Sequence, residues 1–131
     1  MASAFPPRLT AVTIDCADPE RLASFWSALL GVEVEEREEE VVALAPQPGT
    51  GVGVHFRRVP EPKQGKNRAH LDFVVKDADG SRAQVTDLGG QILQRHEEDG
   101  WVWWVVADPR ATRPAWSPPP AEDRVSAGGR W

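Results

Sequence analysis

The sequence predicts an α+β fold made of two similar halves, and three observations support this. One order of elements occurs twice: an alternating strand, an acidic helix start, a helix, a glycine stop and further strands. Only two copies fit in 131 residues, whereas a stacked repeat protein needs about three or more. We therefore expect one domain in which each half covers the open face of the other. The matching positions lie 59 residues apart: Asp18 and Asp77, Leu29 and Leu88, Gly31 and Gly90.

The first half, about residues 9–59, begins with an alternating strand. Its only cysteine, Cys16, is expected to be a small core residue. A lone cysteine allows no intramolecular disulfide and is typical of a reducing cytoplasm. The apolar and the polar or small residues of this strand fall on opposite faces: Val12, Ile14 and Cys16 against Ala11, Thr13 and Asp15.

A helix is predicted directly after that strand. Asp18 is a typical N-cap, Pro19 suits the first helical position, and Gly31 ends the helix. The glutamate-rich run that follows is expected to be a solvent-facing hairpin. The apolar helix face consists of Leu22, Phe25, Trp26, Leu29 and Leu30. Further strands are expected near residues 32–38, 41–45 and 52–59.

The second half, about residues 68–109, repeats this plan after a polar linker. Its first strand carries His70 and Asp72 on one face and apolar residues on the other. The helix expected at 79–88 is weaker, because Gly80 costs about 1 kcal/mol relative to alanine. Two strands follow, joined through a turn at EEDG: near 91–97 and near 101–107.

Charge and hydropathy exclude several classes of partner. The net charge of −5 argues against nucleic acid. The N-terminal residues lack the apolar core of a signal peptide, and no stretch is long enough to span a membrane. These features favour a cytoplasmic protein that binds neither nucleic acid nor membrane.

Three sequence blocks span residues 9–109: LTAVTIDCADPERLASFWSALLG, FRRVPEPKQGKNRAHLDFVVKD and WVWWVVADP. Together they resemble the glyoxalase-like domains of the vicinal oxygen chelate superfamily. The resemblance implies two β-α-β-β-β modules whose curled sheets form an incomplete barrel around a ligand cavity. It also implies a homodimer.

The resemblance further implies where a metal ion would bind, with His or Gln on the first strand of each module and Glu on the last. By position, the first ligand of module one falls on Ala11, which cannot bind a metal, and that of module two falls on His70, which can. The fourth strand offers His55, Phe56 and Arg57 but no carboxylate. One good ligand does not make a site. We therefore expect no cofactor, with a divalent metal at His70 as a weak alternative.

The chain departs from the family pattern after Pro109, where Asp-Pro-x-Gly-Asn-Glu and an apolar strand are expected. Residues 110–131 are rich in proline, which disfavours a central strand. The last strand is therefore expected to be lost or altered, and the tail to be disordered. One G inserted after the Arg110 codon would allow the next codons to be read as Gly-Asn-Glu and apolar residues. A frameshifted end over 111–131 is our hypothesis, and a genuine divergent tail is the alternative.

The strand faces opposite the helices are expected to line the cavity, with flat aromatic walls and a few polar groups. Trp101 and Trp103 share one strand face and Trp104 takes the other, so either Trp104 or the pair faces the helices. Asp15 and Asp72 could form a general-base pair, although carboxylates at a solvated cavity mouth are the commoner case. The ligand-binding candidates are Thr13, Asp15, His55 (or Phe56 in the other register), Arg57, His70, Asp72, Trp101 and Trp103.

No local motif marks catalysis: a phosphate-binding glycine loop is absent, and so is a Ser-His-Asp or Cys-His arrangement. Enzymatic activity is thus left open, because a fold hosts many functions. The leading hypothesis is metal-independent binding of a small aromatic or amphipathic molecule, as in antibiotic-sequestering relatives. One alternative is a metal-dependent lyase, isomerase or dioxygenase-type enzyme that uses His70. The other is a domain without intact activity because its C-terminus is altered.

Overall fold

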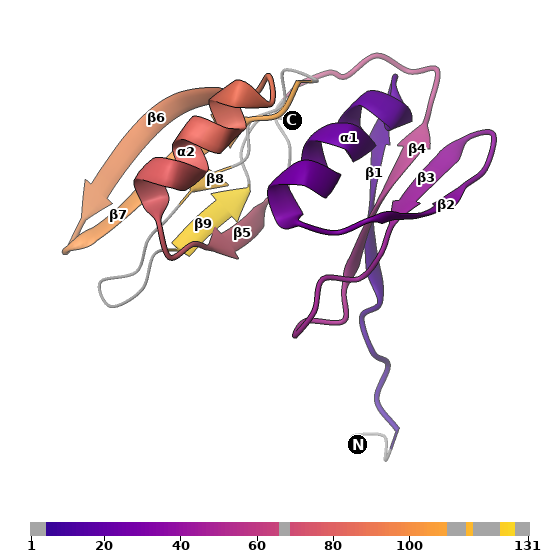
Figure 1. The fold of residues 1–131 in the computed structure, drawn as a ribbon, viewed down its shortest axis with the longest axis horizontal. Helices are drawn as coiled ribbons and strands as arrows, with labels where there is room; N and C mark the ends of the chain where they lie inside the picture. The colour runs from indigo at the N-terminus through magenta and orange to yellow at the C-terminus, as the bar shows by residue number, and fades with distance from the viewer. Residues whose placement is uncertain (1–4, 66–68, 110–114, 117–123, 128–131) are drawn as a thin grey trace. The chain divides into compact units, whose positions relative to one another are not determined.

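The structure is a computed structural model that describes residues 5–65, 69–109, 115–116 and 124–127. It confirms the predicted α+β class (Figure 1). The chain divides into two compact units, Met1–Pro60 and Glu61–Trp131. The elements in chain order are β1 (Ala11–Cys16), α1 (Pro19–Leu30), β2 (Val34–Arg37), β3 (Val41–Leu44), β4 (Gly53–Arg58), β5 (Leu71–Val74), α2 (Ala78–Asp87), β6 (Gln91–Glu98), β7 (Trp101–Ala107), β8 (Ala115–Trp116) and β9 (Arg124–Ala127).

The first unit is a β-α-β-β-β module, as predicted. Its sheet has the strand order β1-β4-β3-β2, in which β1 and β4 run parallel and the other neighbours antiparallel. Helix α1 packs against β3 and β4. The last strand of the module therefore lies beside the first, and the side chains of β1 and β4 are aligned in pairs.

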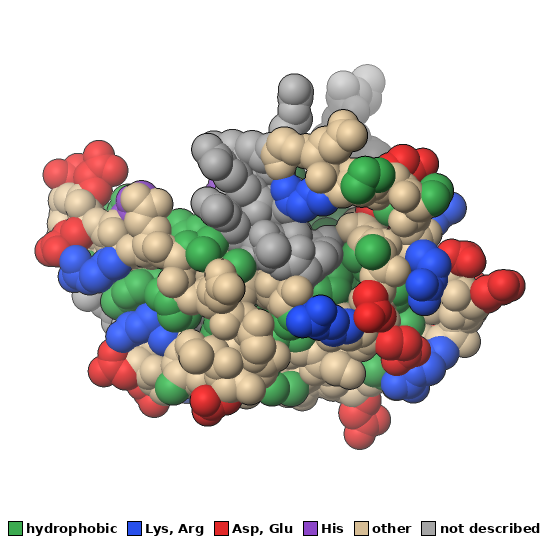
Figure 2. Space-filling view, turned by 90° about the horizontal axis from the view of Figure 1, so that it is seen from above, with side chains coloured by type: hydrophobic (Ala, Val, Ile, Leu, Met, Phe, Trp, Pro, Cys, Tyr) green, Lys and Arg blue, Asp and Glu red, His purple; other side chains and the backbone are tan. Residues whose placement is uncertain are grey.

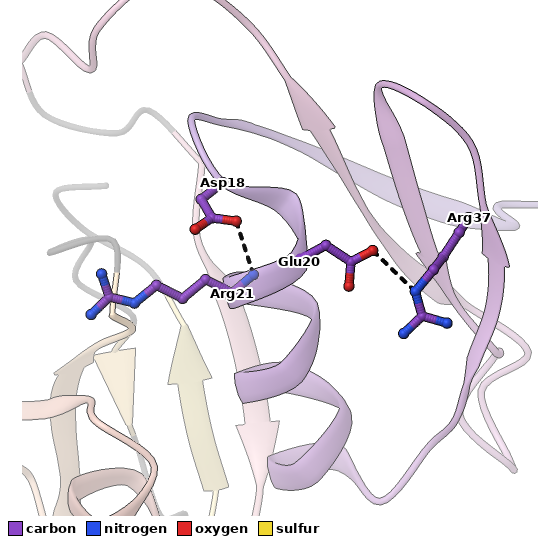
Figure 3. Close-up of polar contacts among 4 residues, drawn as sticks. All are labelled: Asp18, Glu20, Arg21 and Arg37. Atoms are coloured by element: carbon purple, nitrogen blue, oxygen red, sulfur yellow. Dashed lines mark hydrogen bonds and ion pairs between the residues drawn. The ribbon is translucent and has the colours of Figure 1, made fainter.

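Helix α1 begins and ends at the predicted residues. The Asp18 carboxylate accepts a hydrogen bond from the Arg21 amide at 3.2 Å, which satisfies a free N–H of the first turn (Figure 3). Gly31 has a φ of 67° and its N–H bonds the Ser27 carbonyl. An ion pair of 3.0 Å joins Glu20 to Arg37 of β2. This pair is exposed, so it orients the hairpin more than it stabilises the fold.

The core of the first unit lies between α1 and the sheet. Trp26 is 1% exposed, and its ring meets that of Phe25 edge-on, with centroids 5.2 Å apart and planes at 87°. Cys16 is buried, as predicted, and so is Phe56. The other buried apolar side chains of this unit are Ile14, Leu22, Ala23, Val42, Ala43, Leu44 and Val54.

The second unit repeats the module only up to its last strand. In the first unit β1 pairs parallel with β4, whereas β5 pairs antiparallel with β9. Strands β6, β7 and β8 form a separate sheet in that order. Strand β8 lies between Pro114 and Pro118, and β9 follows the last proline, Pro120. The described strands after Pro109 therefore pair differently from the repeat. The predicted disorder of the remaining tail falls on residues outside the described ones.

Helix α2 contacts the rest of its unit through one buried valine and a cation–π contact. Val85 is its only buried residue among those described. The Arg82 guanidinium carbon lies 3.9 Å from the centroid of the Trp104 ring, and that of Arg95 lies 5.9 Å from the same centroid. Trp104 therefore faces α2, which decides between the two orientations that the sequence left open.

A two-residue turn joins β6 to β7, as the EEDG motif predicted. Asp99 and Gly100 have φ values of 51° and 81°. Two central residues with positive φ are typical of a type I′ hairpin turn. The turn places Glu98 opposite Trp101 and His96 opposite Trp103. A bulge between Ile92 and Gln94 changes the register further along.

Within the described part of the chain, no helix is both long enough and apolar enough to cross a membrane.

Gly80 illustrates how the N-cap of α2 constrains its helix. The Asp77 carboxylate accepts a hydrogen bond from the Gly80 amide at 2.9 Å, and its Oδ2 lies where a β-carbon on residue 80 would be. An exposed glycine in a helix normally gains about 1 kcal/mol on replacement by alanine. We expect Gly80→Ala to destabilise the chain instead, because the new methyl displaces the cap, whose loss costs about 0.5–2 kcal/mol.

Urea denaturation measures this effect, and a double-mutant cycle controls it. In an Asp77→Ala background, Gly80→Ala is expected to become stabilising, because no carboxylate remains to be displaced. A gain in stability from Gly80→Ala alone would contradict this account.

Candidate functional site

The first unit places four predicted site residues on the face opposite its buried core. Thr13 and Asp15 are exposed and alternate with buried Ile14 on β1. The parallel register sets Thr13 beside His55 and Asp15 beside Arg57 on β4. Phe56 points to the core, so His55 and Arg57, its neighbours on β4, lie on the opposite face of the sheet. The structure thus brings these four residues together as a polar face, and their role as ligand contacts stays a prediction.

Gly53 leaves room for the His55 imidazole on this polar face. A β-carbon built on Gly53 would lie 3.4 Å from His55 Nε2 and 3.2 Å from the Leu44 carbonyl oxygen. Both distances leave little room for a larger residue. The half-buried imidazole therefore lies over Gly53, a positioning residue that the sequence did not mark.

The second unit brings His70 and Asp72 into direct contact. His70 Nδ1 lies 3.0 Å from Asp72 Oδ1, and the two side chains are 56% and 52% exposed. A carboxylate at Nδ1 orients an imidazole and leaves Nε2 available to accept a hydrogen bond or a proton. Asp15 belongs to the first unit and Asp72 to the second. A general-base pair of these two carboxylates also stays a prediction.

The β6–β7 hairpin carries the tryptophans that were predicted to form an aromatic wall, and that role stays a prediction. Because Trp104 faces α2, Trp101 and Trp103 point to the other side of the strand. Both are half-buried. We call this side of the hairpin the open face, with four defining residues: Trp101, Trp103, His96 and Glu98.

His96 is a site residue that sequence reasoning missed. Its ring stacks on Trp103 with centroids 5.0 Å apart and planes at 12°. A two-residue turn at Asp99 and Gly100 fixes the hairpin register, so residue 98 lies opposite 101 and residue 96 opposite 103. The EEDG motif therefore contained the information needed to place His96 beside Trp103. The stack holds the indole of Trp103 in one orientation and covers one of its two faces.

The described residues do not make a metal site. No group of three or more His, Cys, Asp or Glu side chains gathers anywhere in the described ranges. His55 shares its strand face with the cationic Arg57, and His70 has Asp72 as its carboxylate neighbour. A divalent ion needs several such ligands in one geometry. The described side chains of either unit, taken by itself, therefore offer fewer ligands than a divalent ion needs.

The surface seen in Figure 2 carries acidic and basic side chains intermingled with apolar ones. Among the described residues on that side, no broad area carries positive charge alone. A continuous basic field is the usual mark of nucleic-acid binding. The described side chains in this view show mixed charge rather than such a field.

A family model for glyoxalase-like domains matches residues 11–113. The chain belongs to this family. The resemblance seen in the three sequence blocks is thereby confirmed. A search among curated proteins found no match for this glyoxalase-like domain.

Solved structures share the fold. A glyoxalase/bleomycin resistance protein/dioxygenase family enzyme from Burkholderia phytofirmans PsJN is 17% identical, with a TM-score of 0.69 over 93% of this chain and 99% of the other. TioX from Micromonospora sp. ML1 is 20% identical, with a TM-score of 0.58 over 85% and 98%.

A mutant of the fosfomycin resistance protein FosX from Listeria monocytogenes, complexed with Mn(II) and 1S,2S-dihydroxypropylphosphonic acid, is also similar. It is 10% identical, with a TM-score of 0.69 over 95% of this chain and 90% of the other. At such low identities these likenesses establish the glyoxalase-like fold of the chain, and its chemistry must be argued from its own residues.

Proposed function

We propose that this glyoxalase-like domain binds a small planar aromatic molecule without the help of a metal ion. The observation that carries the proposal is the open face of the β6–β7 hairpin, where the His96–Trp103 stack lies beside Trp101. Flat rings in a fixed orientation with a few polar groups are what small-molecule sites usually offer.

Preorganisation supports binding at this face. The stack with His96 fixes the Trp103 ring before a ligand arrives, so little side-chain freedom is lost on binding. Half-burial leaves part of each indole accessible to solvent. A ligand ring that covers this area would remove apolar surface from water. The proposal includes the predicted homodimer, which family membership supports, and the predicted cytoplasmic location, which the single cysteine of the sequence supports.

We expect binding to depend on the aromatic ring of Trp103 and to survive metal removal. Trp103→Leu keeps an apolar strand residue but removes stacking, which is worth about 1–3 kcal/mol per ring. Affinity for an aromatic ligand should fall roughly tenfold to a hundredfold. Trp103→Phe keeps a ring and should retain most of the affinity. Intrinsic tryptophan fluorescence, screened against planar aromatic metabolites and antibiotics after dialysis with EDTA, provides the measurement.

Two results would contradict the proposal. The first is a chain that binds no member of such a panel, which would favour a domain without intact activity. The second is a stoichiometric divalent ion that the purified protein retains through dialysis, because metal independence would then be wrong.

One observation favours a second candidate, a metal-dependent enzyme that uses His70. Asp72 holds His70 Nδ1, and a carboxylate in that position commonly orients a histidine that ligates metal through its other nitrogen. The FosX structure of similar fold contains Mn(II). The metal analysis described above separates this candidate from the first.

A further inference from the structure

The two faces of strand β7 differ in the charges that accompany their tryptophans. On the α2 side, Trp104 has two protein cations near its ring, Arg82 at 3.9 Å and Arg95 at 5.9 Å. On the open face, no lysine or arginine of the described residues lies over Trp103, whose stacking partner is His96. Among the described residues, arginines therefore supply the cation that the Trp104 ring attracts, whereas none does so for Trp103.

Two consecutive glutamates on β6 show the same division. Glu97 lies on the α2 side, where its carboxylate pairs with Arg95 at 3.0 Å. Glu98 lies on the open face, directly across from Trp101 and diagonally from Trp103. Within the described ranges, Glu98 forms no ion pair and is exposed. The open face thus combines aromatic rings with a carboxylate whose charge the described part of the protein leaves unbalanced.

We infer that the open face selects planar ligands that carry a positive charge, and that Glu98 is the residue that selects them. The inference rests on the proposed function, because it specifies the class of ligand for the same face. A planar cation would stack on the indole, whose negative ring face attracts it. Its charge would lie near the Glu98 carboxylate, which the diagonal of an antiparallel pair brings within reach.

Two probes of nearly equal shape test this selection on the full chain. Quinoline is neutral near neutral pH, and N-methylquinolinium is a permanent cation of almost the same size. Isothermal titration calorimetry at low salt should give an affinity for the cation about five- to tenfold higher than for quinoline. Added salt should reduce this ratio, because it screens an exposed carboxylate.

Two neighbouring substitutions provide a matched control. Glu98→Gln should remove most of the preference for the cation, because the affinity for N-methylquinolinium falls more than the affinity for quinoline. Glu97→Gln removes the same charge from the same strand but on the α2 side, so it should leave the ratio unchanged. Circular dichroism of both variants checks that the hairpin still folds.

Each other outcome counts against the inference. Equal binding of the two probes would overturn it and leave the proposed function standing. Failure of both probes to bind, together with a negative aromatic panel, would overturn both. An equal loss of preference in Glu97→Gln and Glu98→Gln would show that the general negative field of the chain attracts cations, and Glu98 would lose its assigned role.

Discussion

Replacing Trp26 with alanine is expected to lower the free energy of unfolding by about 3–5 kcal/mol, the usual cost of removing a buried Trp or Phe from a core. Trp26 is 1% exposed between α1 and its sheet and meets Phe25 edge-on. The cavity left behind would be lined by side chains that cannot collapse into it without moving α1. Urea denaturation followed by circular dichroism measures the loss.

A second tryptophan provides the comparison for this prediction. Trp103 is half-buried on the open face, so Trp103→Ala should cost less than half as much stability as Trp26→Ala. Trp26→Phe keeps part of the buried ring and should fall between the wild-type chain and Trp26→Ala, which covers the case in which the alanine variant fails to fold. Equal losses for Trp26→Ala and Trp103→Ala would contradict the division into core and open-face tryptophans.

Restoring the family pattern after Pro109 is expected to raise the melting temperature by about 10 °C or more. In the first unit, β4 pairs parallel with β1 over six residues. In the second, β5 has an antiparallel partner of four residues, β9. A regular last strand would bury two or three apolar side chains, each worth about 1.5–3 kcal/mol.

The comparison uses the chain as it stands and a version in which residues 111–131 are replaced by the frame-restored end. A third chain, in which the residues of the frame-restored end are shuffled, controls for the length and composition of that end. Equal melting of the natural and restored chains would remove the reason to regard the tail as damaged. The gene itself gives an independent test, since codons after Arg110 that cannot be regrouped as Gly-Asn-Glu would rule out a frameshift.

The elements that could be predicted from the sequence are those whose structure is determined by residues close to them in the chain. The Asp18 cap and the Gly31 stop of α1 act within four or five residues of the chain, and both were found where expected. Strand alternation likewise placed Thr13 and Asp15 on one face of β1 and Ile14 on the other. Helix capping and the alternation of side chains along a strand depend little on the rest of the fold.

The features that could not be predicted depend on which segments meet. The stack of His96 on Trp103 follows from the hairpin register, and the contact of Arg82 with Trp104 follows from how α2 packs. The antiparallel pairing of β5 with β9 joins residues that are 50 to 56 positions apart in the chain. For the candidate site, alternation therefore predicted the faces, whereas partners and charges came from packing that short-range patterns do not encode.

The Asp99–Gly100 turn limits how the open face could change during evolution. Its two left-handed residues set the pairing of β6 with β7. Because side chains alternate along a strand, adding or deleting one residue between the turn and Trp103 would turn Trp103 toward α2 and Trp104 toward the open face. Arg82 and Arg95 would then lose their contacts with the Trp104 ring. Point substitutions at positions 96, 98, 101 and 103 would therefore change this face and keep the hairpin register. A change in strand length would disrupt the register.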